Sequence, residues 1–154
     1  MSDFGSTSMY LADEPSSGQI PSGWKVIESK APEPARLKVL VVDDQRLIAD
    51  TIADILTDAG FHAIPAYEGI SALAAAEQFK PDYLLTDVLM PRMNGVQLAI
   101  AMRKAHPAIR ILLLSGQAGT AEILLEAKKQ GYEFELLAKP IHPLKLIERL
   151  KEQQ

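Results

Sequence analysis

The chain contains no cysteine, and none of its apolar runs approaches the length of a membrane span. The absence of cysteine excludes disulfides and thiolate metal sites, and it fits a reducing compartment. A transmembrane helix needs about 20 consecutive apolar residues, and the N-terminus also lacks the apolar segment of a secretory signal peptide. We therefore expect a cytoplasmic protein that makes no contact with a membrane.

An excess of positive charge is also absent. The 16 lysine and arginine residues are outnumbered by 20 aspartate and glutamate residues, which gives a formal net charge of -4. Surfaces that bind nucleic acids are usually basic, so direct binding of DNA or RNA is not expected. The apolar fraction of 47% is ordinary for a globular protein, and 154 residues suit a single domain with its own core.

Residues 1–36 differ in composition from the rest of the chain. They are rich in serine, glycine and proline and show no sustained hydrophobic period, so they cannot bury enough apolar area to offset the entropy of ordering. We expect a flexible N-terminal extension over 1–36, followed by one domain over 37–154. The only tryptophan, Trp24, lies in this extension, where it would dock on a partner, fold back onto the domain, or belong to a tail that is weakly ordered or not native.

From residue 37 onward, short apolar runs alternate with segments of helical period. Strands are expected over 38–42, 62–66, 83–86, 110–114 and 136–138. Helices are expected over 46–59, 70–80, 96–105, 120–130 and 143–152. The last helix should turn Leu144, Ile147 and Leu150 inward. Alternating strands and helices predict a parallel sheet with both faces covered, joined by right-handed crossovers.

Four of these strands end on residues that can take part in chemistry. Asp43 and Asp44 follow the first strand, Asp87 the third, Ser115 the fourth and Lys139 the fifth. Parallel strands end at the same edge, and ligands of open α/β sheets bind where the strand order reverses, so these side chains should meet in one pocket. Two carboxylates about 4 Å apart repel by roughly 4 kcal/mol at an effective dielectric near 20, so the pocket needs a cation, or one carboxylate must take up a proton. Oxygen ligands alone favour a hard ion, Mg²⁺ or Mn²⁺.

Four sequence segments carry a family resemblance. They are VVDD, LLTDVLMPRMNG, LLLSG and LAKP, in this order and at the ends of the first, third, fourth and fifth expected strands. Together they resemble the receiver domain of bacterial response regulators, over about residues 38–151. The resemblance implies an α/β fold of the flavodoxin-like (βα)5 type, which is a doubly wound parallel sheet with the strand order 2-1-3-4-5.

The resemblance also implies a phospho-acceptor and a metal site. Asp87 is the phospho-acceptor, since a carboxylate can attack phosphorus and form an acyl phosphate. Asp44, Asp87 and the backbone carbonyl of Leu89 coordinate Mg²⁺, with Mn²⁺ as a possible substitute, and Asp43 acts on the ion through water. From the residues alone a simpler interpretation stays open, in which the aspartate pair only caps the helix that follows.

Lys139 and Ser115 complete the site that the resemblance implies. Lys139, followed by a cis bond to Pro140, supplies a flexible ammonium to the acceptor. Ser115 is the switch hydroxyl, which hydrogen-bonds a phosphoryl oxygen. Taken one at a time, these residues have ordinary alternatives, namely a solvated lysine at a strand end and a turn formed by Ser115 and Gly116.

The chain departs from the family pattern where receivers usually carry a switch aromatic. That position, three residues before the lysine, is occupied by Leu136, although Tyr132 and Phe134 lie nearby. We therefore expect the change to be transmitted mainly by movement of the loop after Ser115.

The loops around Asp87 raise two further expectations. Leu89 and Gln117 occupy places that tune hydrolysis in this family, and an apolar Leu89 cannot orient an attacking water. We therefore expect a long-lived phosphoryl group. Asn94 and Gly95 suit a turn with positive φ and are expected to be structural rather than chemical.

The sequence thus predicts a phospho-accepting receiver rather than an enzyme, with at most slow self-dephosphorylation. A histidine kinase or a phosphotransfer protein would supply the phosphoryl group. The surface of the fourth helix, fifth strand and fifth helix would then bind an output protein, or a second copy in a weak dimer. The chain ends just after the last expected helix, so a stand-alone regulator, a phosphorelay intermediate and a receiver excised from a longer protein all stay open.

Two alternatives come from other functional classes. One is an interaction module that keeps the fold but needs no phosphorylation, which the complete set of strand-end residues argues against. The other is a metal-dependent phosphohydrolase with an aspartyl-phosphate intermediate. Such an enzyme needs a second acid two residues after the nucleophile, where this chain has Leu89.

Overall fold

The structure is a computed structural model that describes residues 20–27, 35–116 and 118–152. The chain divides into two units, Met1–Ala35 and Arg36–Gln154. In the described part of the first unit, the N–H of Trp24 donates to the carbonyl of Pro21 at 3.2 Å, in a turn where Gly23 has a φ of +91°. The expected flexibility of residues 1–36 stays a prediction, because most of this segment lies outside the described ranges.

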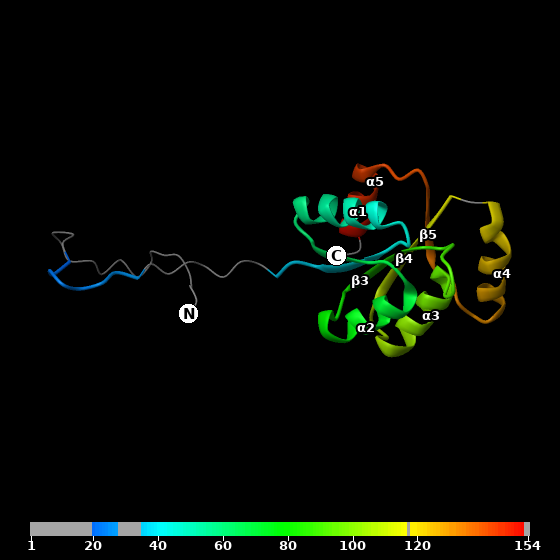
Figure 1. Cartoon of the computed structure of the whole chain (residues 1–154), viewed down its shortest axis with the longest axis horizontal. Coiled ribbons are helices and arrows are strands. Elements are labelled where there is room, and N and C mark those ends of the chain that lie inside the picture. Colours follow the sequence, from blue (N-terminus) through cyan, green and yellow to red (C-terminus); the bar gives the residue numbers. More distant parts are fainter. Residues whose placement is uncertain (1–19, 28–34, 117, 153–154) are drawn as a thin grey trace. The chain divides into compact units, whose positions relative to one another are not determined.

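The second unit alternates strands and helices (Figure 1), and the predicted elements are present to within about one residue at either end. The strands are β1 (Lys38–Val42), β2 (His62–Ala66), β3 (Tyr83–Asp87), β4 (Arg110–Ser115) and β5 (Glu135–Ala138). The helices are α1 (Arg46–Asp58), α2 (Gly69–Phe79), α3 (Gly95–Ala105), α4 (Ala121–Lys129) and α5 (Pro143–Glu152), and a 3₁₀ turn, η2 (Ala118–Thr120), precedes α4. Among the described residues, none of the helices combines the length and the hydropathy that a membrane span requires.

The five strands form one parallel sheet in the order β2-β1-β3-β4-β5. This order confirms the predicted flavodoxin-like, doubly wound fold. Helices α1 and α5 cover one face of the sheet, and α2 and α3 cover the other (Figure 1). The strand order reverses between β1 and β3, which is where open α/β sheets place their ligands.

Each face of the sheet has its own apolar core. Alternate side chains of a strand point to opposite faces, so Leu40 of β1 joins one core and Val41 joins the other. The first core includes Met102 of α3, and the second includes Leu56 of α1 and Leu146 of α5. The continuously apolar strands are therefore explained by burial on both sides.

The last helix is turned differently from the prediction. We expected Leu144 to face inward, but it is 63% exposed, and Leu146 is buried in its place. Ile147 and Leu150 do pack against the core of α1 and α5. Residues two positions apart in a helix are rotated by about 200° around its axis, so Leu144 and Leu146 cannot share a face. The buried pair has the i, i+4 spacing that places Leu146 beside Leu150.

We expect Leu113→Ala to lower the free energy of unfolding by about 2–5 kcal/mol, because Leu113 is fully buried in β4 and its truncation leaves a cavity. The matched control is Leu144→Ala, which should change the free energy of unfolding by less than about 0.5 kcal/mol. Urea unfolding at neutral pH, followed by circular dichroism, measures both. Equal losses in the two variants would contradict the observed orientation of α5.

Candidate functional site

The register of the sheet places the chemically useful residues along one edge. Asp87 ends β3 and Ser115 ends β4. Asp43 directly follows β1, and Lys139 directly follows β5. Backbone hydrogen bonds extend the strand pairing past the strand ends, from the N–H of Asp43 to the carbonyl of Ala66 at 3.2 Å and from the N–H of Lys139 to the carbonyl of Ser115 at 2.9 Å. The main chain itself therefore positions the site.

Three carboxylates gather at this edge. Asp43, Asp44 and Asp87 each offer an oxygen atom, and these atoms lie within 4.8 Å of one another. Asp43 is only 1% exposed and accepts a hydrogen bond from the N–H of Gln45 at 2.9 Å, whereas Asp44 is exposed. The N-cap of α1 is Gln45, whose side chain makes no capping hydrogen bond, so the alternative in which the aspartate pair only caps the helix is not borne out. The other oxygen of Asp43 faces Lys139.

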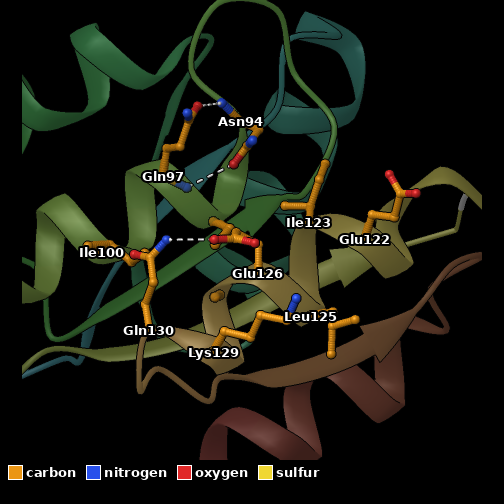
Figure 2. Close-up of a pocket in the computed structure, with 11 residues that line it drawn as sticks. Asn94, Gln97, Ile100, Glu122, Ile123, Leu125, Glu126, Lys129 and Gln130 are labelled. Atoms are coloured by element: carbon orange, nitrogen blue, oxygen red, sulfur yellow. Dashed lines mark hydrogen bonds between the residues drawn. The ribbon is translucent and has the colours of Figure 1, made fainter.

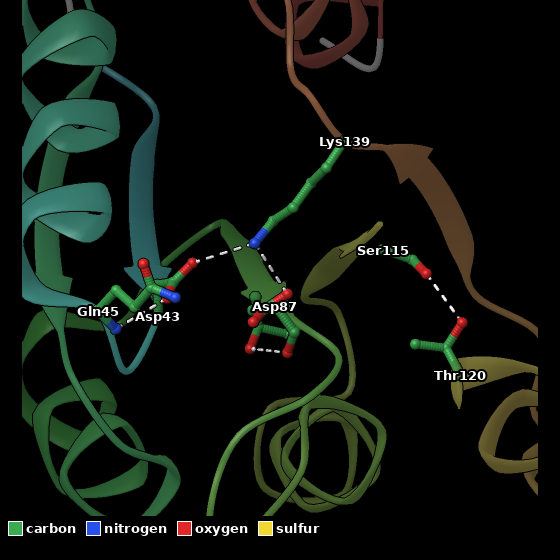
Figure 3. A network of polar contacts seen from close by, with 7 residues as sticks. Asp43, Gln45, Asp87, Ser115, Thr120 and Lys139 are labelled. Carbon is green, nitrogen blue, oxygen red and sulfur yellow. Dashed lines mark hydrogen bonds and ion pairs between the residues drawn. The ribbon is translucent and has the colours of Figure 1, made fainter. Parts of the chain in front are cut away.

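Lys139 reaches the carboxylates from the end of β5 (Figure 3). Its Nζ atom lies 3.1 Å from Oδ1 of Asp87 and 3.5 Å from Oδ2 of Asp43. The side chain is 24% exposed, so it is not a freely solvated lysine. Its bond to Pro140 is cis, as the resemblance implies. A Cβ atom on Gly116 would lie 2.8 Å from Cβ of Lys139, so glycine leaves room for the lysine stem.

The pKa values of the central pair are shifted by their surroundings. Burial raises the pKa of Asp87 above its usual 3.8; the hydrogen bond and charge of Lys139 oppose this shift, while the charges of Asp43 and Asp44 add to it. Burial alone would lower the pKa of Lys139, but the hydrogen bonds and charges of Asp87 and Asp43 outweigh burial and raise that pKa above 10.5. Lys139 therefore stays an ammonium at neutral pH, and Asp87 is the group whose ionisation is resisted.

Ser115 does not face the carboxylates. Its Oγ atom lies 2.9 Å from Oγ1 of Thr120, and the two hydroxyls face each other (Figure 3). Thr120 is buried, ends η2 and immediately precedes α4. The sequence gives little reason to expect a role for Thr120, since its one signal is a second hydroxyl residue at the start of the fourth expected helix.

Gly95 shapes the loop after Asp87, though not for the reason expected. The expectation of positive φ at Asn94 and Gly95 is wrong: Asn94 has a φ of -78°, Gly95 has no positive φ, and the left-handed residue of this loop is Arg92, with a φ of 69°. Glycine is needed at 95 because a Cβ atom there would collide with the backbone carbonyl of Asp87. The N–H of Gly95 also donates to the carbonyl of Val88 at 2.7 Å.

The start of α3 is fixed by a reciprocal cap. The side chain of Asn94 accepts from the N–H of Gln97 at 2.8 Å, and the side chain of Gln97 accepts from the N–H of Asn94 at 2.9 Å. This capping box satisfies two backbone donors at the helix start. The helix start and the backbone of Asp87 are thus held together as one piece.

The donor set of the cluster fits a hard divalent cation. Three carboxylates face a single ammonium, and two unit charges about 5 Å apart repel by roughly 3 kcal/mol at an effective dielectric near 20. The carbonyl of Asp87 accepts from the hydroxyl of Thr86 at 3.0 Å, and that of Val88 is engaged by Gly95. The next main-chain oxygen of the loop belongs to Leu89. Carboxylate and carbonyl oxygens are the ligands that Mg²⁺ and Mn²⁺ prefer.

The structure describes only some of the residues that the sequence links to signal transmission and hydrolysis. Gln117 lies outside the described residues. Leu136 is exposed on β5, while Tyr132 and Phe134 stack with ring centroids 6.0 Å apart and pack against the core of α2 and α3. How a change at Asp87 reaches the surface stays a prediction.

A doubly wound α/β sheet that carries an aspartate cluster and a lysine at its carboxyl edge is the architecture of a signalling switch domain. The family model described as response regulator receiver domain matches residues 39–151. The chain therefore belongs to the response regulator receiver family, as the sequence motifs predicted.

Relatives of two kinds share this domain. The chain is 32% identical to the chemotaxis protein CheY of Thermotoga maritima over 114 residues, which cover 73% of this chain and 93% of that protein. It is 28% identical over 116 residues to the DNA-binding response regulator MtrA of Mycolicibacterium paratuberculosis, which cover 75% of this chain and 50% of MtrA. The chain thus spans about half the length of MtrA and similar relatives.

Solved structures agree with the fold. The chemotaxis protein CheY4 of Vibrio cholerae matches with a TM-score of 0.68 and 32% identity, covering 77% of this chain and 98% of that one. The receiver domain of NtrX from Brucella abortus matches with a TM-score of 0.64 and 31% identity, covering 74% and 95% of the two chains.

In the metal-free protein, Asp87→Asn should raise the free energy of unfolding at neutral pH. An acid whose pKa is raised by folding contributes stability that is complete below its unfolded pKa of 3.8 and is lost as the pH rises through its folded pKa. The amide removes this loss, so the gain of the variant over wild type should grow as the pH rises from about 4 to about 7. Urea unfolding in the presence of a chelator measures it.

The control for this experiment is Asp54→Asn, which neutralises an exposed aspartate of α1. It should show no comparable gain. If the gain in unfolding free energy of Asp87→Asn shrinks as the pH rises, Asp87 is not an acid whose pKa is raised by folding.

Proposed function

We propose that this chain is a phospho-accepting receiver, which takes a phosphoryl group on Asp87 from a histidine kinase or a phosphotransfer protein and then changes its affinity for an output protein. The observation that carries the proposal is the ammonium of Lys139 lying 3.1 Å from Oδ1 of Asp87, inside a cluster of three carboxylates. The ammonium offsets the negative charge of an arriving phosphoryl group, and the three carboxylates can hold a cation that does the same.

Asp44, Asp87 and the carbonyl of Leu89 would hold Mg²⁺ or Mn²⁺, with Asp43 acting through water. The clustering of the three carboxylate oxygens supports this ligand set. When bound, the ion supplies positive charge that offsets the negative charge on the oxygens of the phosphoryl group during transfer.

The chain's own residues perform the transfer. A carboxylate oxygen of Asp87 attacks the phosphorus of a phosphohistidine, a P–O bond forms, the P–N bond breaks, and the imidazole leaves with its electron pair. The ammonium of Lys139 then binds the phosphoryl oxygens, because it already contacts Asp87 and its side chain is flexible. Phosphoryl transfer depends mainly on such positioning and charge compensation. Ser115 then hydrogen-bonds a phosphoryl oxygen.

The surface made by α4, β5 and α5 would bind the output protein. It presents the exposed apolar side chains of Leu125, Leu136 and Leu144, one from each element. Exposed apolar side chains that recur across neighbouring elements are typical of protein interfaces. A weak dimer through the same surface is the competing use. We propose a cytoplasmic location, slow self-dephosphorylation as the only catalysis, and no direct contact of this domain with nucleic acid, although MtrA is described as DNA-binding.

Acetyl phosphate with Mg²⁺ should add one phosphoryl group to the wild-type chain, and Asp87→Asn should remain unlabelled. Intact-mass spectrometry measures the label. Without Mg²⁺ the labelling rate should fall by about tenfold or more, because the carboxylates then repel the donor.

The matched control for labelling is Asp54→Asn, which removes an exposed carboxylate of α1 that does not belong to the cluster and should be labelled like wild type. Labelling of Asp87→Asn to the wild-type extent would place the acceptor elsewhere. A wild-type chain that takes no label would favour an interaction module that works without phosphorylation.

Leu89→Asn should shorten the lifetime of the phosphorylated chain several-fold, because a polar side chain two residues past Asp87 can orient an attacking water and Leu89 cannot. The control is Leu89→Met, which keeps the position apolar and should decay like wild type. Loss of label is followed by intact mass after removal of acetyl phosphate. Equal or slower decay in Leu89→Asn would count against the proposed role of Leu89.

A further inference from the structure

The hydroxyl pair of Ser115 and Thr120 joins the end of β4 to the start of α4. The two oxygens lie 2.9 Å apart, and Thr120 is buried. Thr120 is the N-cap residue of α4, yet its side chain makes no capping hydrogen bond to the helix, and its backbone is already helical, with φ -86° and ψ -15°. A hydroxyl placed where threonine commonly caps a helix is thus engaged by Ser115 instead.

A serine hydroxyl has one proton to donate. Phosphoryl oxygens only accept, so Ser115 must donate a hydrogen bond to them. To do so, its side chain must turn toward Asp87 and away from the orientation in Figure 3. Its hydrogen bond with Thr120 is then given up. The start of α4 is then released from the side-chain bond that ties it to the end of β4.

Helix α4 is able to respond because it is loosely held. Only Ala127 of this helix is buried, whereas α3 buries five residues. A groove of about 800 Å³ separates the two helices (Figure 2), lined by Gln97 and Ile100 of α3 and by Ile123 and Glu126 of α4, among others. A helix with a small buried face and an open flank can shift with little loss of packing.

We propose that Thr120 is a positioning residue of the switch, which holds Ser115 away from Asp87 in the unphosphorylated chain and passes the change to α4 once Ser115 leaves. This inference rests on the proposed function of Asp87 as phospho-acceptor. It gives α4 a direct mechanical connection to the acceptor through two hydroxyl groups.

The test titrates the full chain with beryllofluoride and Mg²⁺, a mimic of a phosphoryl group on a carboxylate, while NMR follows the backbone amides. Thr120→Val keeps the side-chain shape and removes the hydroxyl, and Thr120→Ser keeps the hydroxyl. Since no bond to Thr120 has to break, Thr120→Val should bind beryllofluoride about fivefold more tightly than wild type, the equivalent of one net hydrogen bond. Thr120→Ser should bind like wild type.

The NMR spectra provide a second readout of the same titration. In Thr120→Val the amide signals of α4 should shift less than in wild type, while those beside Asp87 and Lys139 shift as before. Thermal unfolding confirms that each variant is folded. Thr120→Ala is the replacement without a hydroxyl if Thr120→Val does not fold.

A background of Ser115→Ala separates positioning from general structure. There the valine substitution should leave the beryllofluoride affinity unchanged, because the serine hydroxyl that Thr120 restrains has been removed. An equal effect of Thr120→Val in both backgrounds, or unchanged or weaker binding by folded Thr120→Val, overturns the role of Thr120 and leaves Asp87 as acceptor. If the wild-type chain binds no beryllofluoride and takes no label from acetyl phosphate, the proposed function fails, and the role of Thr120 with it.

Discussion

The site depends on one electrostatic constraint. Backbone register forces three carboxylates to the same edge of the sheet, and one lysine offsets them only in part. The folded chain tolerates this arrangement because the cores on both faces hold the strand ends in place. Burial of Asp87 among like charges makes it costly to ionise, and the same environment makes any cation or charge-neutralising reaction favourable. Fold stability and reactivity are therefore opposed at this edge.

The two sides of Asp87 differ in how firmly they are held. Toward α3, the capping box of Asn94 and Gln97 and the tight packing of Gly95 leave little room for movement. Toward α4, a hydroxyl pair and a lightly buried helix connect the site to the surface. On the proposed function, a phosphoryl group on Asp87 would therefore displace α4 rather than α3.

Features set by short-range pattern were predictable from the sequence, and features set by tertiary contact were not. The strands and the residues at their ends follow from apolar runs that stop at Asp, Ser or Lys, so the fold and the gathering of these residues at one edge were predictable. The inward face of α5 was misassigned because Leu144 and Leu146 are equally apolar, and only packing decides between them. The need for Gly95 and the bond between Thr120 and Ser115 both arise where separate elements meet.

The tight packing of Gly95 has a consequence for how binding partners divide this domain. Since tight packing fixes the backbone of Asp87 to the first turn of α3, a protein that binds α3 alone should bind both states of the proposed switch about equally well. A protein that discriminates between them needs contact with α4. Permanent anchoring and reading of the signal are therefore separable on adjoining helices, and one receiver can stay bound to a scaffold while its state is read by another protein.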